Sequence, residues 1–171
     1  LSSSLEFSHF PVMLNEVIKI SSPQKGGLYV DCTFGGGGYS KELLKYPNTN
    51  VIGIDRDSSA VSLAKQLEKK FKKRFKFHKI KFSQIDTILN NSVDSIIFDL
   101  GLSSIQLNNL KRGFSFKSKE KLDMSMGLTS ISAEKVINSF SEESLKSIIK
   151  ILGEEKDASE IAKNIIKERL V

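Results

Sequence analysis

Short apolar runs alternate with amphipathic stretches over the first hundred residues of the chain. The runs are rich in β-branched and aromatic side chains, and they predict buried strands at about residues 28–32, 51–55, 75–80 and 93–98. The stretches between them predict helices at about residues 39–46 and 58–67, and a weaker helix over residues 82–89. Strands that alternate with helices are typical of an α/β domain with a parallel sheet and helices on both faces.

The pattern changes after Asp99. Residues 101–109 are polar and aperiodic, which predicts a loop. Helical periodicity then returns at about residues 132–140, 141–152 and 158–169, with Ser132 and Ser141 at expected N-cap positions. We therefore expect an α/β domain over residues 1–110 and an all-helical region over residues 111–171.

Composition excludes several classes of protein. The longest apolar runs fall well short of the roughly 20 residues of a membrane helix, and residues 1–6 do not resemble a secretory signal. The single cysteine, Cys32, suits a reducing compartment, and packing explains it better than nucleophilic chemistry. We expect a cytoplasmic protein without a membrane segment. The only histidines, His9 and His78, are not spaced as metal ligands, so no metal site is expected.

Positive charge is concentrated in one segment. The chain has a net charge of +6, and the segment from Lys65 to Lys81 alone holds nine basic residues against one acid. Such a segment either contacts nucleic-acid phosphates or forms a solvated face. The sequence leaves both interpretations open.

Acids and glycines mark the ends of the predicted strands. Asp31 ends the first strand and precedes four glycines, Gly35 to Gly38, while Asp55 and Asp99 follow the second and fourth strands. A glycine turn lets the backbone approach a ligand closely. An acid some twenty residues later is placed to accept hydrogen bonds from ribose hydroxyls. This arrangement predicts a nucleotide pocket at the carboxyl ends of the strands. The spacing Gly35-x-Gly37 lacks the third glycine of a dinucleotide site, because Ser40 stands there. Together with the three acids at the strand ends, this favours S-adenosylmethionine over a dinucleotide.

Eight motifs in a fixed order closely resemble the bacterial methyltransferase family RsmH, also called MraW. They are His9-x-Pro-Val12, Asp31-x-Thr-Phe-Gly-x-Gly-Gly38, Gly53-Ile-Asp-Arg-Asp57, Asp99-Leu-Gly-x-Ser-Ser104, Gln106-Leu107, Arg112-Gly-Phe-Ser-Phe116, Leu122-Asp-Met124 and Gly153-Glu-Glu155. The resemblance implies methylation of the exocyclic amine of a cytidine in 16S ribosomal RNA, within the small ribosomal subunit. It also implies a Rossmann-like class I core that binds S-adenosylmethionine, followed by an inserted all-helical domain. Further strands of the sheet would lie outside this chain, so we expect an N-terminal portion.

The resemblance also implies site residues. The cofactor contacts would be Gly37, Gly38, Tyr39, Asp55, Phe82, Asp99 and Gln106. Because Asp99 stands at the mouth of the fourth strand, it is also the candidate catalytic acceptor for the target amine, and a purely cofactor-binding role remains open. Four residues depart from the family pattern, namely Tyr39 for a usual His, Ile105 for Pro, Asn108 for Asp and Ser125 for Arg. Other open interpretations are a methyltransferase for another nucleic acid or small molecule, and a non-catalytic remnant.

Overall fold

The computed structural model describes residues 11–128 and 131–169. Its four strands are β1 (Gly27–Asp31), β2 (Thr49–Ile54), β3 (Phe75–His78) and β4 (Ser95–Ile97). The helices of the same part of the chain are α1 (Leu14–Ser21), α2 (Gly38–Leu43), α3 (Ser59–Phe71), α4 (Ser104–Asn108), α5 (Ala133–Ser139), α6 (Glu142–Ile151) and α7 (Ala158–Glu168). Short 3₁₀ helices are η1 (Pro23–Lys25), η2 (Lys72–Arg74), η3 (Phe82–Thr87) and η4 (Leu110–Arg112).

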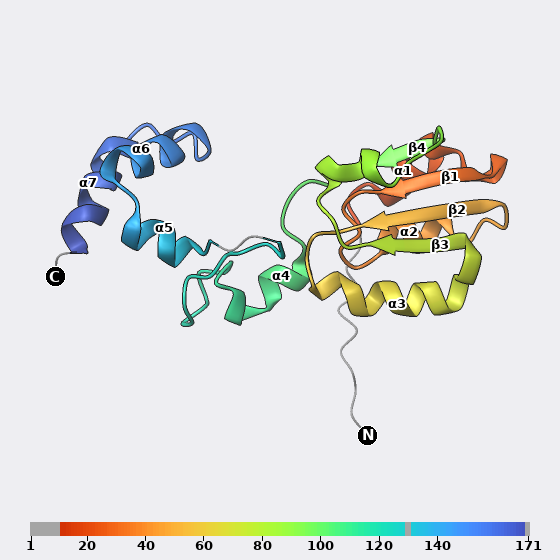
Figure 1. Cartoon of the computed structure of the whole chain (residues 1–171), viewed down its shortest axis with the longest axis horizontal. Coiled ribbons are helices and arrows are strands. Elements are labelled where there is room, and N and C mark those ends of the chain that lie inside the picture. The colour runs from red at the N-terminus through yellow and green to blue at the C-terminus, as the bar shows by residue number, and fades with distance from the viewer. Residues whose placement is uncertain (1–10, 129–130, 170–171) are drawn as a thin grey trace, which may run out of the picture. The chain divides into compact units, whose positions relative to one another are not determined.

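The four strands form one parallel sheet in the order β3-β2-β1-β4 (Figure 1). Asp31 at the end of β1 pairs with Gly53 of β2 and Ile97 of β4, so these strands end at nearly the same level. The strand order reverses at β1, and a reversal of this kind opens a crevice beyond the carboxyl ends of the strands. The predicted parallel sheet is confirmed.

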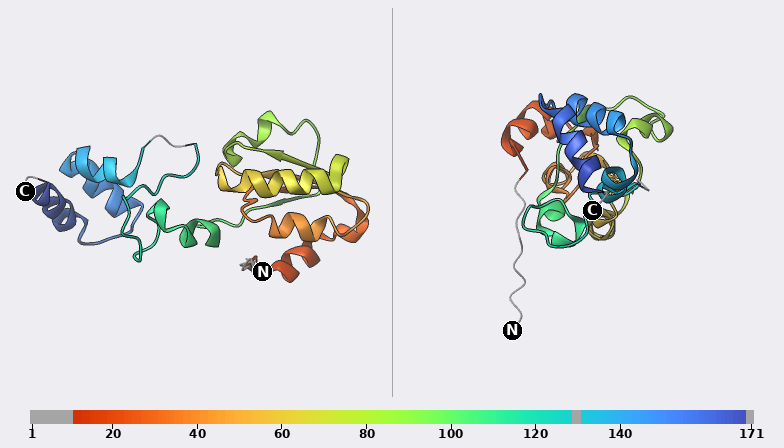
Figure 2. Two further views of the ribbon diagram at one scale, coloured as in Figure 1. Left: turned by 90° about the horizontal axis from the view of Figure 1, so that it is seen from below. Right: turned by 90° about the vertical axis from the view of Figure 1, so that its left-hand side faces the viewer.

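Different layers cover the two faces of the sheet. Helices α1, α2 and α3 lie on one face of the sheet (Figure 2). They share one core with Tyr29, Val51 and Phe75 of the sheet. On the opposite face, Val30 and Ile54 pack against η3 and the segment that leads from it to β4. The sequence predicts helices on both faces of the sheet. Among the described residues, α-helices cover only one face. Residues 82–87 instead form a 3₁₀ helix that is kinked at Gln84.

β4 is a short edge strand. It has three residues and pairs with β1, and among the described strands none pairs with its outer edge. Ile96 and Phe98 on this strand and just after it are 43% and 49% exposed. The apolar pattern that predicts a strand over residues 93–98 thus marks a segment that is only partly paired and covered.

The chain forms two compact units. The described part of the first comprises residues 11–108 and 126–128, and that of the second comprises residues 109–125 and 131–169. In the second unit α6 and α7 pack together, with Leu145, Ala158 and Ala162 buried. The predicted N-caps are confirmed, because the hydroxyl oxygens of Ser132 and Ser141 accept hydrogen bonds from the third amide of α5 and of α6.

The prediction of a loop at residues 101–109 is wrong in part, because this segment contains α4. Five helical residues are too few to show a hydrophobic period, so the sequence pattern could not predict this helix. Within the described residues, no helix combines the length and the apolar character that crossing a bilayer requires.

Candidate active site

A cavity of about 620 Å³ lies at the carboxyl ends of the strands. Each strand contributes a wall residue from the segment that follows it, namely Thr33 after β1, Asp55 after β2, Phe82 after β3 and Asp99 after β4. This volume is in the usual range for a small-molecule site. The predicted position of the pocket is confirmed, and Asp55 and Asp99 share it.

The glycine turn serves two different purposes. Gly37 has φ +72°, and a Cβ there would lie 2.7 Å from the Phe34 ring, while a Cβ on Gly38 would lie 2.1 Å from the Pro11 ring. Packing within the protein therefore requires glycine at these two positions. By contrast, a Cβ on Gly35 or Gly36 would meet no protein atom closer than 3.8 Å, and both residues line the cavity. The bare backbone that a ligand can approach is at Gly35 and Gly36.

Asp55 holds the turn after β1 against the turn after β2. Its Oδ2 accepts a hydrogen bond from the backbone N–H of Gly35 at 2.7 Å, and its Oδ1 accepts one from that of Asp57 at 2.8 Å. Burial raises the pKa of the Asp55 carboxyl, and the nearby Asp57 charge adds to this. A carboxylate has about four acceptor positions. Asp55 can therefore also accept hydrogen bonds from a ligand in the cavity.

Gln106 and Asp57 form a buried bridge beneath the cavity. The Gln106 amide nitrogen donates to Asp57 Oδ2 at 2.9 Å, and its Oε1 accepts from the backbone N–H of Ser103 at 2.9 Å. Asp57 Oδ1 in turn accepts from the backbone N–H and the hydroxyl of Ser59 at the start of α3. Gln106 and Asp57 are only 5% and 3% exposed. Gln106 thus fixes the loop after β4 as well as lining the cavity.

Asp99 stands just past the end of β4. Its backbone N–H donates to the Thr33 hydroxyl oxygen at 2.8 Å. Its Oδ2 lies 3.3 Å from the Tyr39 hydroxyl, which also donates to the backbone oxygen of Val12. Burial raises the pKa of Tyr39 to about 12, with a further contribution from the Asp99 charge, so this phenol stays protonated at neutral pH.

Asp31 lies beneath the glycine turn and is fully buried. Its Oδ2 accepts a hydrogen bond from the Ser40 hydroxyl at 2.7 Å, while Oδ1 meets no donor among the described residues. Burial raises the pKa of this carboxyl to about 6, although the Ser40 hydrogen bond lowers it in part. Ionisation of Asp31 is therefore less favourable in the folded protein than in the unfolded chain.

The structure brings together six of the seven residues that the sequence predicts as cofactor contacts. Those that line the cavity are Gly38, Tyr39, Asp55, Phe82, Asp99 and Gln106. Gly37 is not among the described lining residues; it is the N-cap residue of α2 and lies against the Phe34 ring. Sequence reasoning assigned no role to Thr33 and Asp57, although both stand in motifs quoted for the family resemblance.

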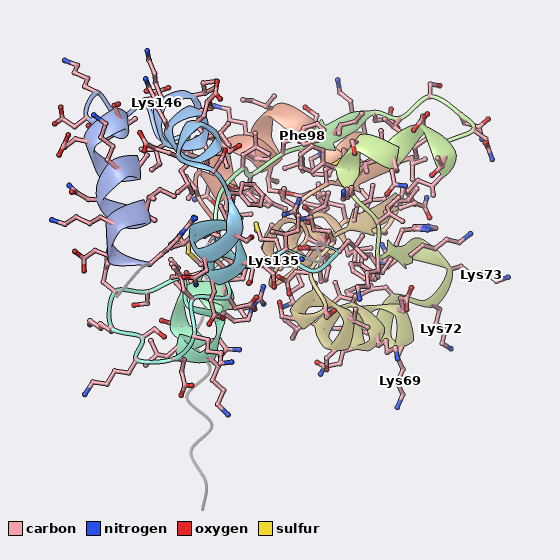
Figure 3. The ribbon with its side chains drawn as sticks, turned by 60° about the vertical axis from the view of Figure 1, so that its left-hand side comes forward. Lys69, Lys72, Lys73, Phe98, Lys135 and Lys146 are labelled. Atoms are coloured by element: carbon pink, nitrogen blue, oxygen red, sulfur yellow. The ribbon has the colours of Figure 1, made fainter. Side chains whose placement is uncertain are left out.

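The basic segment divides into residues with different surroundings. The Arg74 guanidinium donates to four backbone carbonyls at and after the end of α2, so it has a structural role. The side chains of Lys69, Lys72 and Lys73 extend into solvent (Figure 3). Because α3 begins beside the cavity at Ser59 and is about 20 Å long, these lysines lie at the far end of the helix from the site.

Nothing in the described residues resembles a metal centre. No group of three or more His, Cys, Asp or Glu side chains is placed to hold an ion there. His9 lies outside the described residues. Cys32 is buried, and burial raises the pKa of its thiol to about 11, which fits the packing role expected for it.

Comparison with known proteins shows where this arrangement belongs. A family model described as the MraW methylase family matches residues 6–171. The chain belongs to the MraW methylase family. Relatives of this chain include proteins named ribosomal RNA small subunit methyltransferase H. The protein from Ehrlichia ruminantium (strain Welgevonden) is 41% identical over 94% of this chain and 56% of its own length. That from Clostridium botulinum (strain Kyoto / Type A2) is 44% identical over 96% of this chain and 55% of its own length.

A third relative, from Zymomonas mobilis subsp. mobilis, is 38% identical over 98% of this chain and 52% of its own length. The chain therefore spans about half the length of the curated relatives it matches. All the residues that line the cavity lie within the part of the chain that the family model matches.

Proposed function

We propose that this chain binds S-adenosylmethionine and supplies that site to an enzyme that methylates the exocyclic amine of a cytidine in 16S ribosomal RNA. Membership of the MraW methylase family carries the reaction class. The names of the relatives support a small-subunit ribosomal RNA substrate. A ribosomal substrate would also place the protein in the cytoplasm.

The chemistry of the cavity fits this cofactor. When bound, S-adenosylmethionine supplies a methyl group on a positively charged sulfur. Asp55, Asp57 and Asp99 line the cavity together with one base, Arg56. The acids outnumber the base, and the excess negative charge complements a sulfonium and an ammonium. Asp55 would hold the ribose hydroxyls, and Gly35 and Gly36 offer backbone that a ligand can approach. Phe82 is 42% exposed at the cavity wall, where its ring would pack against the adenine.

Asp99 would act on the target amine. A cytosine amine is a weak nucleophile because its lone pair is delocalised into the ring. A carboxylate that accepts a hydrogen bond from the N–H localises that pair while the N–C bond forms and the C–S bond breaks. The amine then loses one proton, to Asp99 or to water. Thr33 fixes the backbone of Asp99 at the cavity wall, as this role requires.

The target base would have to leave its stack to reach this cavity. Enzymes that modify a base act on extruded or single-stranded nucleotides, because the reacting atom is otherwise inaccessible. Most of the catalytic effect would then come from holding the amine in line with the methyl group at about 3 Å.

Calorimetry with S-adenosylmethionine tests the cofactor site. The chain should bind it, and Asp55→Asn should weaken binding roughly 10- to 100-fold, since a hydrogen bond to a charged acceptor contributes about 1.5–3 kcal/mol. Asp86→Asn removes an exposed acid from η3 and serves as the control, with unchanged affinity expected. Equal affinities of the unmodified chain and Asp55→Asn would contradict the assignment of Asp55.

The substrate is tested with a radiolabelled methyl group. The natural gene product that contains these residues should label small ribosomal subunits and not free cytidine, and Asp99→Asn should reduce the rate. Labelling of free cytidine at an equal rate would favour a small-molecule methyltransferase. Cofactor binding without any transfer would favour a non-catalytic remnant.

A further inference from the structure

The geometry points to Thr33 and Tyr39 as positioning residues that hold Asp99, from its backbone and from its side chain respectively. This inference rests on the proposed function, in which Asp99 accepts a hydrogen bond from the target amine. In this inference the Tyr39 hydroxyl positions Asp99 and does not contact the cofactor.

Thr33 fixes the backbone of Asp99 where the sheet ends. The last backbone hydrogen bond between β1 and β4 runs from the Cys32 N–H, just after β1, to the Ile97 oxygen at 2.9 Å. One step further, the Asp99 N–H donates to Thr33 Oγ1 at 2.8 Å, so a side chain extends the strand pairing beyond β4. A residue just past a three-residue edge strand would otherwise have few constraints on its backbone.

Tyr39 constrains the carboxylate of the same residue. Its ring is 5% exposed in the first turn of α2, and its hydroxyl reaches both Val12 O and Asp99 Oδ2. The Val12 oxygen is the nearer acceptor, at 2.5 Å, and Asp99 Oδ2 lies 3.3 Å away. Rotation about the C–O bond turns the single hydroxyl proton from one acceptor to the other. When the proton faces Asp99, Oδ2 is held and the second carboxylate oxygen remains available to the amine of a base.

A fixed carboxylate matters for the methyl transfer because the amine must lie in line with the methyl group. A carboxylate that rotates freely would direct the lone pair of the amine in several directions. Only the direction toward the methyl group is productive. Thr33 and Tyr39 both come from the glycine-turn segment. The same segment would therefore shape the cofactor site and orient the acid that faces the substrate.

Steady-state methylation of small ribosomal subunits by the natural gene product tests the inference. Tyr39→Phe removes only the hydroxyl, and Thr33→Val replaces the acceptor hydroxyl with a methyl group. Each should lower kcat roughly tenfold, the equivalent of about 1.4 kcal/mol, while KM and the Kd for S-adenosylmethionine change less than about twofold. Thr33→Ser keeps the oxygen and should restore kcat.

Two comparisons separate positioning from a general structural effect. Tyr29→Phe removes another buried hydroxyl, one that donates to the Gly26 oxygen at the opposite end of β1, and it should leave kcat unchanged. Because Tyr39 acts through Asp99, the double variant Tyr39→Phe/Asp99→Asn should be no slower than Asp99→Asn alone.

The outcomes are distinguishable. Unchanged kcat in Tyr39→Phe, a raised Kd for the cofactor that accounts for the whole loss, or additive losses in the double variant would each overturn the inference and leave the proposed function intact. If the unmodified protein transfers no methyl group to small subunits, the proposed function fails and the inference fails with it.

Discussion

Asp31→Asn should make the protein more stable at pH 8 and less stable below pH 4. Asp31 is fully buried, with one carboxylate oxygen bonded to Ser40 and the other without a donor among the described residues. Burial raises the pKa of this carboxyl from 3.8 to about 6. The folded protein therefore binds a proton more tightly than the unfolded chain, and stability falls as the pH rises from about 4 through 6.

The magnitude follows from the two pKa values. One pKa unit corresponds to about 1.4 kcal/mol, so a rise from 3.8 to about 6 makes ionised Asp31 unfavourable by about 3 kcal/mol above pH 7. Asparagine keeps an acceptor for the Ser40 hydroxyl, but its amide brings buried donors that cost about 1–2 kcal/mol. The net effect is a gain of about 1–2 kcal/mol at pH 8 and a loss of similar size below pH 4.

Urea unfolding of both proteins between pH 4 and pH 8 measures this difference directly. Groups that do not interact with Asp31 affect both proteins equally, so they cancel when the two free energies of unfolding are subtracted. Between pH 4 and pH 8 the exception is Asp55, whose charge adds to the rise in the pKa of Asp31. Asp86→Asn, at an exposed position in η3, is the control and should show a small difference at every pH. A difference for Asp31→Asn that does not change with pH, or that falls as the pH rises, would refute the reasoning.

Three further predictions concern single contacts. Gly37→Ala should lower the free energy of unfolding by about 2 kcal/mol or more, because φ is +72° and the new Cβ would meet an aromatic ring; unchanged urea unfolding would contradict this. Asp99→Asn should lower the pKa of Tyr39, since the Asp99 charge is one cause of its rise to about 12; ultraviolet absorbance of tyrosinate measures it, and an unshifted titration would exclude the contact. Arg74→Ala should destabilise the protein by roughly 3 kcal/mol, because four carbonyls lose a charged donor, whereas Lys73→Ala, at an exposed neighbour, should leave thermal unfolding nearly unchanged.

Much of the fold was predictable because its signals are local. Strand ends and their acids were predicted because apolar runs end abruptly at Asp31, Asp55 and Asp99. In parallel strands such ends meet at one edge, so the position of the cavity followed from the sequence as well.

Contacts between distant residues were not predictable. The bridge from Gln106 to Asp57 joins residues 49 positions apart, and the sequence carries no sign of it. In the sequence Arg74 is one residue of a basic segment. In the structure its guanidinium donates hydrogen bonds to backbone oxygens some 25 to 30 residues earlier. The steric reason for glycine at position 38 likewise depends on the ring of Pro11, which lies far from it in the sequence. Sequence spacing placed these residues near a ligand but could not show which atoms require them.

The outer side of β4 has a practical consequence for handling these 171 residues in isolation. A strand with no described neighbour on one side presents a row of amide and carbonyl groups that another chain can add to. Here the row adjoins Ile96 and Phe98, both more than 40% exposed, so an added chain would also cover apolar surface. We expect the sedimentation coefficient of the isolated chain to rise with concentration, and a lysine at position 96 should suppress that rise.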